Sequence, residues 1–185
     1  LLVAYRKSNN KAKAEDVIKS LLDKVPLFHP IRFEAFMNGL LEEKEFNTLI
    51  RNEQPNEVYI DLADWYISIG CNDDALKILS YTKNCPIAGY MIAYLQNNAN
   101  KKTASLTTLS STNSLDVDYV FPYRPETIKY LEWAQDIMPS WKIDYYEALI
   151  HWSNLNKERS LAIMDRIDKI DYAPFYLSRA MLKSG

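Results

Sequence analysis

The amino-acid sequence predicts an all-α fold made of antiparallel helix pairs. Its most informative feature is a spaced set of side chains, Tyr59-x2-Leu62-Ala63-x2-Tyr66, followed by Ala75-x3-Leu79, which places a small residue on each of two consecutive helices. The 185 residues include only 4 Gly and 8 Pro, fewer than the frequent turns of a β-sandwich require. With 48% hydrophobic positions, the chain is interpreted as one helical-repeat domain spanning residues 1–185.

The second helix of this pair has a pattern that recurs along the chain. A small residue is followed four positions later by a large one and three positions after that by another apolar one, and this spacing lets two helices approach closely at the small residue. The pattern is found at Ala14-x3-Ile18-x2-Leu21, Thr127-x3-Leu131-x2-Ala134 and Ser160-x3-Met164-x2-Ile167. Pro26 and Pro139 follow two of these segments, and proline ends a helix because it lacks an N–H group.

These spacings resemble the tetratricopeptide-repeat family, whose unit is a helix pair of about 34 residues. The resemblance covers residues 56–86, 1–26 and 127–172, and the last unit is aligned on Tyr145-x2-Ala148-Leu149-x2-Trp152. It implies a right-handed α–α superhelix of antiparallel pairs. Between the matching regions, residues 100–114 are poor in strong helix formers and predict only a short helix. Residues of about 112–125 are expected to form an irregular connection that contains Pro122 and Pro125.

A second resemblance is to the C-terminal repeat region of large bacterial proteins that carry an N-terminal β-rich, sugar-enzyme-like domain of unknown function. The segments that carry it are residues 118–127, 141–152 and 173–180. This resemblance implies that the chain is a fragment of a longer array, and it supplies no catalytic residue. Neither end has the polar cap of a terminal repeat, so further repeats are expected beside Leu1–Leu2 and Phe175–Met181.

Composition argues against several classes of partner. The net charge is −2, the positive charges are scattered, and no basic stripe able to neutralise several phosphates is present, which argues against nucleic acid. No apolar run reaches the roughly 20 residues of a membrane span, so no membrane insertion is expected. Cys71 and Cys85 are expected to lie about 20 Å apart along one helix, too far for a disulfide, and reduced thiols favour a cytoplasmic location.

The sequence predicts no enzyme, metal site or cofactor. Its two histidines, His29 and His151, lie far apart, whereas a zinc site brings three or four nitrogen and sulfur ligands together. Acidic pairs such as Asp73-Asp74 are interpreted as helix caps that oppose the positive end of the helix dipole. No catalytic residue is therefore assigned.

The resemblance implies non-catalytic binding of a protein or peptide, or support of another domain of the same parent chain. Ligand-facing side chains in such repeats come from the first helix of each pair. Counted from Tyr59 and Tyr145, these positions are Glu57, Ile60, Asp64, Ile67 and Ser68 in one repeat, and Ile143, Tyr146, Ile150, Ser153 and Asn154 in the other. Trp65, Tyr146 and Tyr176 are expected to be exposed aromatic anchors.

The alternative hypothesis is a helical domain that binds or processes glycans in an aromatic-lined cleft. Glycoside hydrolysis needs two carboxyl groups about 5–10 Å apart across such a cleft. Only Asp64 and Glu147 lie at apolar positions of the matched first helices, so the direction in which they point discriminates between the hypotheses.

The proposed pairing predicts that Ala75→Leu lowers the free energy of unfolding by about 1–3 kcal/mol, because the larger side chain overpacks the contact between the two helices. Thermal unfolding followed by circular dichroism measures the effect. An unchanged melting temperature would count against the predicted pairing.

Overall fold

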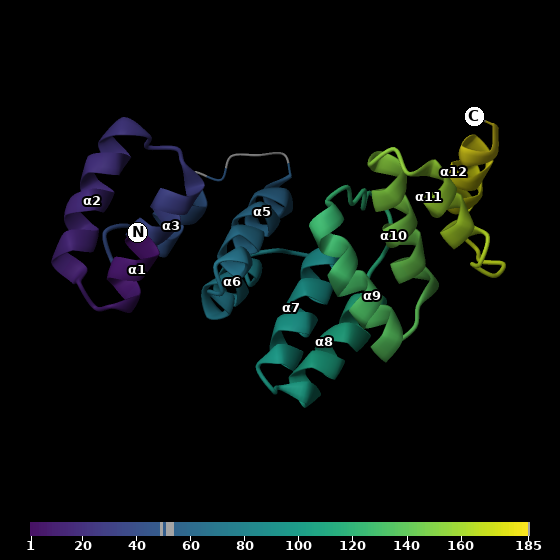
Figure 1. Cartoon of the computed structure of the whole chain (residues 1–185), viewed down its shortest axis with the longest axis horizontal. Helices are drawn as coiled ribbons and strands as arrows, with labels where there is room; N and C mark the ends of the chain where they lie inside the picture. The colour runs from purple at the N-terminus through teal and green to yellow at the C-terminus, as the bar shows by residue number, and fades with distance from the viewer. Residues whose placement is uncertain (49, 51–53, 185) are drawn as a thin grey trace. The chain divides into compact units, whose positions relative to one another are not determined.

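The computed structural model describes residues 1–48, 50 and 54–184, and the prediction of an all-α fold is confirmed for them. These residues form twelve α-helices and one short 3₁₀ helix, with no strand (Figure 1). The chain divides into two compact units, Leu1–Tyr81 and Thr82–Gly185, which are described separately below. The single domain over 1–185 and the right-handed superhelix stay predictions.

The first unit consists of six helices. They are α1 (Leu2–Lys7), α2 (Lys11–Lys24), α3 (His29–Met37), α4 (Glu43–Thr48), α5 (Pro55–Ser68) and α6 (Asn72–Leu79). Neighbours in sequence pack together, α1 on α2, α2 on α3, α3 on α4 and α5 on α6. The pair predicted from residues 59–79 is therefore α5 and α6.

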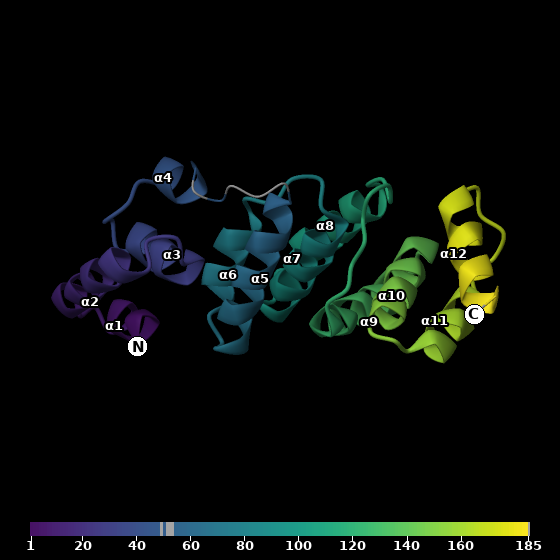
Figure 2. The ribbon, with the colours of Figure 1, turned by 90° about the horizontal axis from the view of Figure 1, so that it is seen from above.

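The second unit continues the same scheme of packed neighbouring helices. It contains α7 (Pro86–Asn98), α8 (Lys102–Asn113), the 3₁₀ helix η1 (Pro125–Thr127), α9 (Ile128–Ile137), α10 (Trp141–Ser153), α11 (Lys157–Met164) and α12 (Ala173–Ser184). Helix α7 packs on α8 and α9, α10 packs on α9 and α11, and α11 packs on α12 (Figure 2).

Four of the helix pairs are joined by the same tight turn. Each turn contains one residue with positive φ: Asn9 (57°), Gly70 (76°), Asn100 (61°) and Leu155 (62°). The next backbone N–H donates to a carbonyl five residues earlier, as from Cys71 to Tyr66 at 2.8 Å and from Asn156 to His151 at 2.9 Å. This is a Schellman turn, which satisfies the last carbonyls of the first helix and reverses the chain within three residues.

In each of these four pairs, the turn places a small, buried residue at the same position of the second helix. Five residues after each positive-φ residue come Ala14, Ala75, Ser105 and Ser160, all at most 2% exposed, and four residues later come the buried Ile18, Leu79, Leu109 and Met164. The two serine hydroxyls donate to carbonyls of the first helix, Ser105 to Ala93 at 2.8 Å and Ser160 to Ala148 at 2.7 Å. The buried hydroxyls are thereby satisfied.

Helix α8 is longer than the sequence predicts. It spans Lys102–Asn113, although its Ser and Thr residues are weak helix formers. Its packing against α7 compensates, because Ser105 bonds to Ala93 and the Thr108 hydroxyl donates to the Gln96 side chain at 2.9 Å. The approach is close enough that a Cβ at Gly89 would lie 2.2 Å from Thr112 Oγ1, which explains the glycine inside α7.

The irregular connection expected at about 112–125 is slightly shorter than predicted and covers residues 114–124, because α8 ends at Asn113 and η1 begins at Pro125. Its start is held by Lys142 of α10, whose ammonium group donates to the carbonyls of Asn113 and Leu115. The expectation that one helix joins the two cysteines is wrong, since α6 ends at Leu79 and Cys85 precedes α7; neither Cys71 nor Cys85 forms a disulfide.

A buried charge network lies in the first unit. Arg6 of α1 donates to both carboxylate oxygens of Glu34 (2.9 Å each) and to both of Asp74 (3.0 and 3.1 Å), and the Tyr66 hydroxyl donates to Glu34 at 2.5 Å. The Lys7 ammonium lies 3.1 Å from Asp74. The network joins α1, α3, α5 and α6.

The interpretation of Asp74 as a helix cap is therefore wrong. Asp74 is 3% exposed and pairs with cations of α1, whereas Asp73 is exposed. Burial alone would raise the pKa of Asp74, but the hydrogen bonds from Arg6 and Lys7 outweigh it and lower that pKa below its ordinary value.

Asp74→Asn is expected to lower the free energy of unfolding at pH 7 by about 3 kcal/mol, because the half-buried Arg6 loses a buried charged partner. Since the pKa of Asp74 is lower in the folded chain than in the unfolded one, the stabilisation is present above about pH 4 and is lost as the pH falls through the folded value. The free energy of unfolding, measured in urea, should therefore fall more between pH 7 and acid pH for the wild type than for the variant.

The exposed neighbour supplies the control, since Asp73→Asn should keep the wild-type pH dependence. Equal pH dependence of the wild type and Asp74→Asn would contradict the role given to the ion pair.

Candidate functional site

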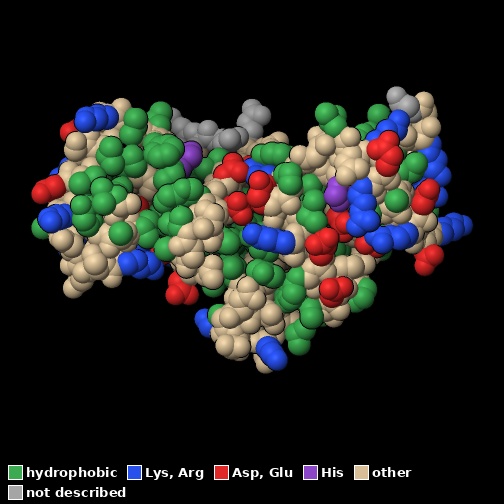
Figure 3. All heavy atoms as spheres, in the orientation of Figure 1, with side chains coloured by type: hydrophobic (Ala, Val, Ile, Leu, Met, Phe, Trp, Pro, Cys, Tyr) green, Lys and Arg blue, Asp and Glu red, His purple; other side chains and the backbone are tan. Residues whose placement is uncertain are grey.

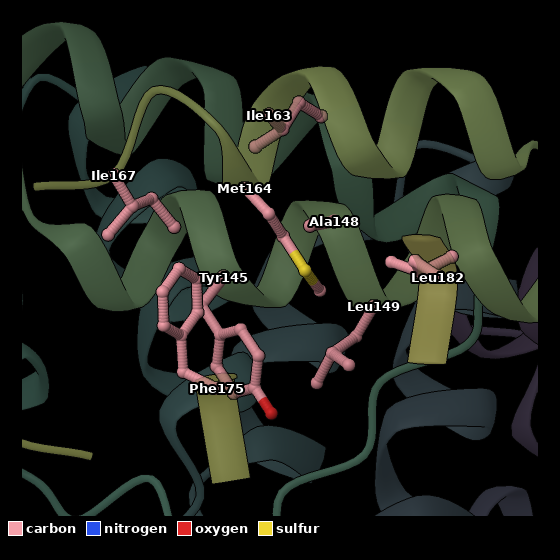
Figure 4. Close-up of a cluster of buried hydrophobic side chains, with 8 residues drawn as sticks. All are labelled: Tyr145, Ala148, Leu149, Ile163, Met164, Ile167, Phe175 and Leu182. Atoms are coloured by element: carbon pink, nitrogen blue, oxygen red, sulfur yellow. The ribbon is translucent and has the colours of Figure 1, made fainter. Parts of the chain in front are cut away.

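The candidate site lies beside a hydrophobic core of the second unit. Buried side chains of α10, α11, α12 and the segment after α11 converge there on one core, which Figure 4 shows in close-up: Tyr145, Ala148, Leu149, Ile163, Met164, Ile167, Phe175 and Leu182. The rings of Tyr145 and Phe175 meet edge to face, with 5.8 Å between their centroids. This packing gives one side of the site a rigid floor.

A pocket of about 400 Å³ lies beside this core. The segment after α8 contributes Phe121, Pro122 and Tyr123; α10 contributes Tyr145, Leu149, Trp152 and Ser153; and α12 contributes Ser178. Most of the lining is apolar and aromatic, and none of these described lining residues carries a formal charge. Phe121, at 73% exposed, stands at the rim. We call this pocket the α10 groove.

One wall of the groove is an extended segment held by side chains at the end of α10. The Asn154 amide donates to the Tyr123 carbonyl at 2.7 Å and to the Ile150 carbonyl of its own helix at 2.8 Å. The Ser153 hydroxyl bonds to the Ile150 carbonyl at 2.9 Å and lies 3.5 Å from that of Tyr123. The guanidinium of Arg124 stacks on the Tyr123 ring, 4.3 Å from its centroid. Asn154 thus ties this wall to α10.

The polar groups of the groove are neutral donors and acceptors. The hydroxyls of Tyr145 and Ser178 lie 3.3 Å apart. Burial raises the pKa of Tyr145, and the hydrogen bond to Ser178 opposes this only in part, so the phenol stays protonated at neutral pH. The hydroxyl groups of the described lining can therefore donate and accept hydrogen bonds.

The predicted alignment of α10 with α5 is wrong by one residue. The tight turns make Ala63 equivalent to Ala148, because each lies seven residues before the positive-φ residue, Gly70 or Leu155. Tyr59 then corresponds to Asp144 rather than to Tyr145. With this correction the positions equivalent to the first predicted set are Lys142, Tyr145, Leu149, Trp152 and Ser153. Four of these five line the α10 groove.

The shift explains why most of the second predicted set is buried. Ile143, Tyr146 and Ile150 are all 0% exposed and pack inside the second unit, so the expectation that Tyr146 is an exposed anchor is wrong. Its hydroxyl is buried and has no hydrogen-bond partner, and burial raises its pKa. Of the second set, Ser153 lines the groove, and Ser153 and Asn154 both bond to its wall at the Tyr123 carbonyl.

The first predicted set lies on α5, in the first unit. Ile60 is 1% exposed and is excluded from any ligand surface of that unit by its packing. Glu57, Asp64 and Ile67 are half-buried, while Ser68 is exposed. The expectation that Trp65 and Tyr176 are exposed is confirmed, at 44% and 41%. A ligand-binding role for Glu57, Asp64, Ile67 and Ser68 stays a prediction.

Glu147 does not point into the groove. It is 5% exposed, with its carboxylate 3.7 Å from His151 Nε2 and 3.6 Å from the Arg159 guanidinium. Burial raises the pKa of Glu147, and the nearby charge of Glu132 adds to this, while Arg159 opposes it. Asp64 belongs to the first unit. Within the second unit, the described residues therefore place no carboxyl pair across the aromatic lining.

Charge is dispersed over the surface. Figure 3 shows Lys and Arg side chains scattered among acidic and apolar ones on the face in view. Over the described part of the chain, no group of three or more His, Cys, Asp or Glu side chains is arranged to hold a metal ion. In the same residues, no helix has the length and apolar character needed to cross a membrane.

Comparison with models of known protein families gives no match for this chain, and comparison with curated protein sequences gives no match either.

Asn154→Ala is expected to loosen the wall of the α10 groove, because Tyr123 loses the hydrogen bond that ties it to α10. Amide hydrogen exchange in residues 119–124 should become about fivefold faster, which corresponds to the loss of about 1 kcal/mol. Mass spectrometry of the exchanged protein measures this effect.

Ser153→Ala removes the longer contact to Tyr123 and the hydroxyl's bonds to Ile150 and Asn154, but it keeps the hydrogen bond from Asn154 to Tyr123, so it should change exchange much less. Unchanged exchange in Asn154→Ala would show that the segment is held by other contacts.

Proposed function

We propose that this chain is a non-catalytic binding module, a tetratricopeptide-like helical array that binds an extended apolar peptide in the α10 groove. The observation that supports this most is the composition of the groove: aromatic and aliphatic side chains from three segments surround a pocket of about 400 Å³, with hydroxyl groups at its edge. A pocket of this kind favours a bulky apolar side chain, while the hydroxyls can bond to the flanking peptide groups.

The rigidity of the groove supports a binding role. Tyr145 and Leu149 belong to the packed core beneath it, and Asn154 ties the opposite wall to α10. Because these groups are ordered before a ligand arrives, binding costs little reorganisation. Phe121, exposed at the rim, supplies an aromatic surface that a ligand can cover.

The proposal covers a segment of a second protein and a segment of another domain of the same parent chain. The groove selects for side-chain chemistry, and an apolar peptide presents the same chemistry from either source. The lining carries no charge, so the affinity should depend weakly on salt concentration.

The alternative function is glycan binding. The rings of Trp152, Tyr123 and Phe121 at the groove favour it, because aromatic faces pack against sugar rings. Few polar groups accompany them, however, and a sugar needs several hydrogen-bond partners to replace its water. The peptide proposal therefore fits the lining better.

Selection of random 12-residue peptides displayed on phage tests the proposal directly. Peptides retained by the full chain should share bulky apolar residues. Ser153→Trp fills the groove from an exposed position and should weaken binding of the enriched peptides at least about tenfold, because the pocket is occupied. Fluorescence anisotropy with labelled synthetic peptides measures this.

The matched control is Ser110→Trp, at an exposed serine of α8 that does not line the groove, and it should bind the peptides as the wild type does. Enriched peptides that bind Ser153→Trp with unchanged affinity would refute the groove as the site. Retention of oligosaccharides on a glycan array, abolished by Ser153→Trp, would favour the alternative function instead.

A further inference from the structure

A second surface of the molecule, on α12, repeats the features of helix faces that are covered elsewhere in the chain. Helices α7, α10 and α12 share three positions at spacing i, i+3 and i+7, and eight of the nine residues at these positions are buried. These triplets are Ala88, Met91 and Leu95 in α7; Ile143, Tyr146 and Ile150 in α10; and Phe175, Ser178 and Leu182 in α12, of which only Ser178 is half-buried. The shared spacing aligns the three helices.

The alignment assigns a position to Ala180. In α7 and α10 an alanine lies five residues after the start of the triplet, Ala93 and Ala148, and both are 0% exposed. Each is covered by the second helix of its pair, whose Ser105 or Ser160 donates to the alanine carbonyl. Ala180 lies five residues after Phe175, but it is exposed.

The neighbours of Ala180 continue the same surface. Leu177 and Met181 are 63% and 52% exposed, whereas Tyr145 and Leu149 at the equivalent positions of α10 are 3% and 9% exposed and belong to the buried core. Leu177, Ala180 and Met181 thus form an apolar stripe along one side of α12, which we call the α12 stripe. Its other side is anchored by Phe175 and Leu182, and by ion pairs of Arg179 and Lys183 with Asp165.

We propose that the α12 stripe binds one amphipathic α-helix, with a small residue packed on Ala180 and a large aliphatic residue four positions later. In α7 and α10, the equivalent alanine is covered by the helix that follows. That helix has this pattern in both cases, Ser105-x3-Leu109 in α8 and Ser160-x3-Met164 in α11. The small residue is required because the backbones approach closely there, and a hydroxyl at that position can donate to the Ala180 carbonyl. The proposal goes beyond the α10 groove, and none of Leu177, Ala180 and Met181 lines that groove.

The probe is a fluorescein-labelled synthetic peptide of residues 156–169 of this chain, which contains the Ser160-x3-Met164-x2-Ile167 pattern. Titration with the full chain should raise its anisotropy, and circular dichroism should show a gain in helicity. The chain's own α11 is tethered next to α10, so the free peptide does not displace it at micromolar concentration. A peptide with Ser160→Trp should not bind, because the close approach is blocked.

Ala180→Glu in the chain should weaken binding at least about tenfold, because it places a charge inside the contact. Ala104→Glu, at an exposed alanine of α8, is the matched control and should leave binding unchanged. Phe121→Ser, which alters the α10 groove, should also leave it unchanged, so failure of this proposal and failure of the groove proposal are distinguishable.

Equal binding to the wild type and Ala180→Glu would overturn the assignment of the stripe, and absence of binding would overturn the proposal. Concentration-dependent self-association in sedimentation, abolished by Ala180→Glu, would show that a second copy covers the stripe instead.

Discussion

The helix pairs of both units depend on close approach at one small residue, and this approach depends on the turn that precedes it. A residue with positive φ lets the last carbonyls of the first helix bond back, so the chain reverses within three residues. The second helix then always meets the first at the same position, where Ala14, Ala75, Ser105 and Ser160 are buried. A larger side chain there would separate the helices and expose the aliphatic residue that follows one turn later.

The two units add different interactions to this shared contact. In the first unit, Arg6 pairs with the carboxylates of Glu34 and Asp74, Lys7 also pairs with Asp74, and the Tyr66 hydroxyl donates to Glu34. Buried ionic networks specify which helices meet, because an unpaired member would cost several kcal/mol. In the second unit the same purpose is served by aromatic packing around Tyr145 and by hydroxyl-to-carbonyl bonds between helices.

The α10 groove and the α12 stripe follow from the same geometry. The turn orients α10 so that Tyr145, Leu149 and Trp152 lie on the side that faces α12 and the segment 121–123. Helix α12 repeats that orientation and presents Leu177, Ala180 and Met181 in the equivalent place. Binding surfaces of a helical array are positions of the repeat that the array itself leaves uncovered.

The sequence by itself determined that the chain is helical and that α5 pairs with α6, because helical periodicity and the small residues Ala63 and Ala75 are local signals. Only the tertiary structure decided which residue of α10 meets α11. Tyr145-x2-Ala148-Leu149 and the correct alignment differ by one residue, and both preserve an apolar face, so periodicity cannot choose between them. The alignment is fixed by the turn at Leu155, whose positive φ cannot be predicted from the local sequence pattern. Because of that one-residue difference, Tyr146 lies in the core and Leu149 lines the groove. The burial of Asp74 likewise depends on a distant residue, since its partner Arg6 lies 68 positions away in sequence.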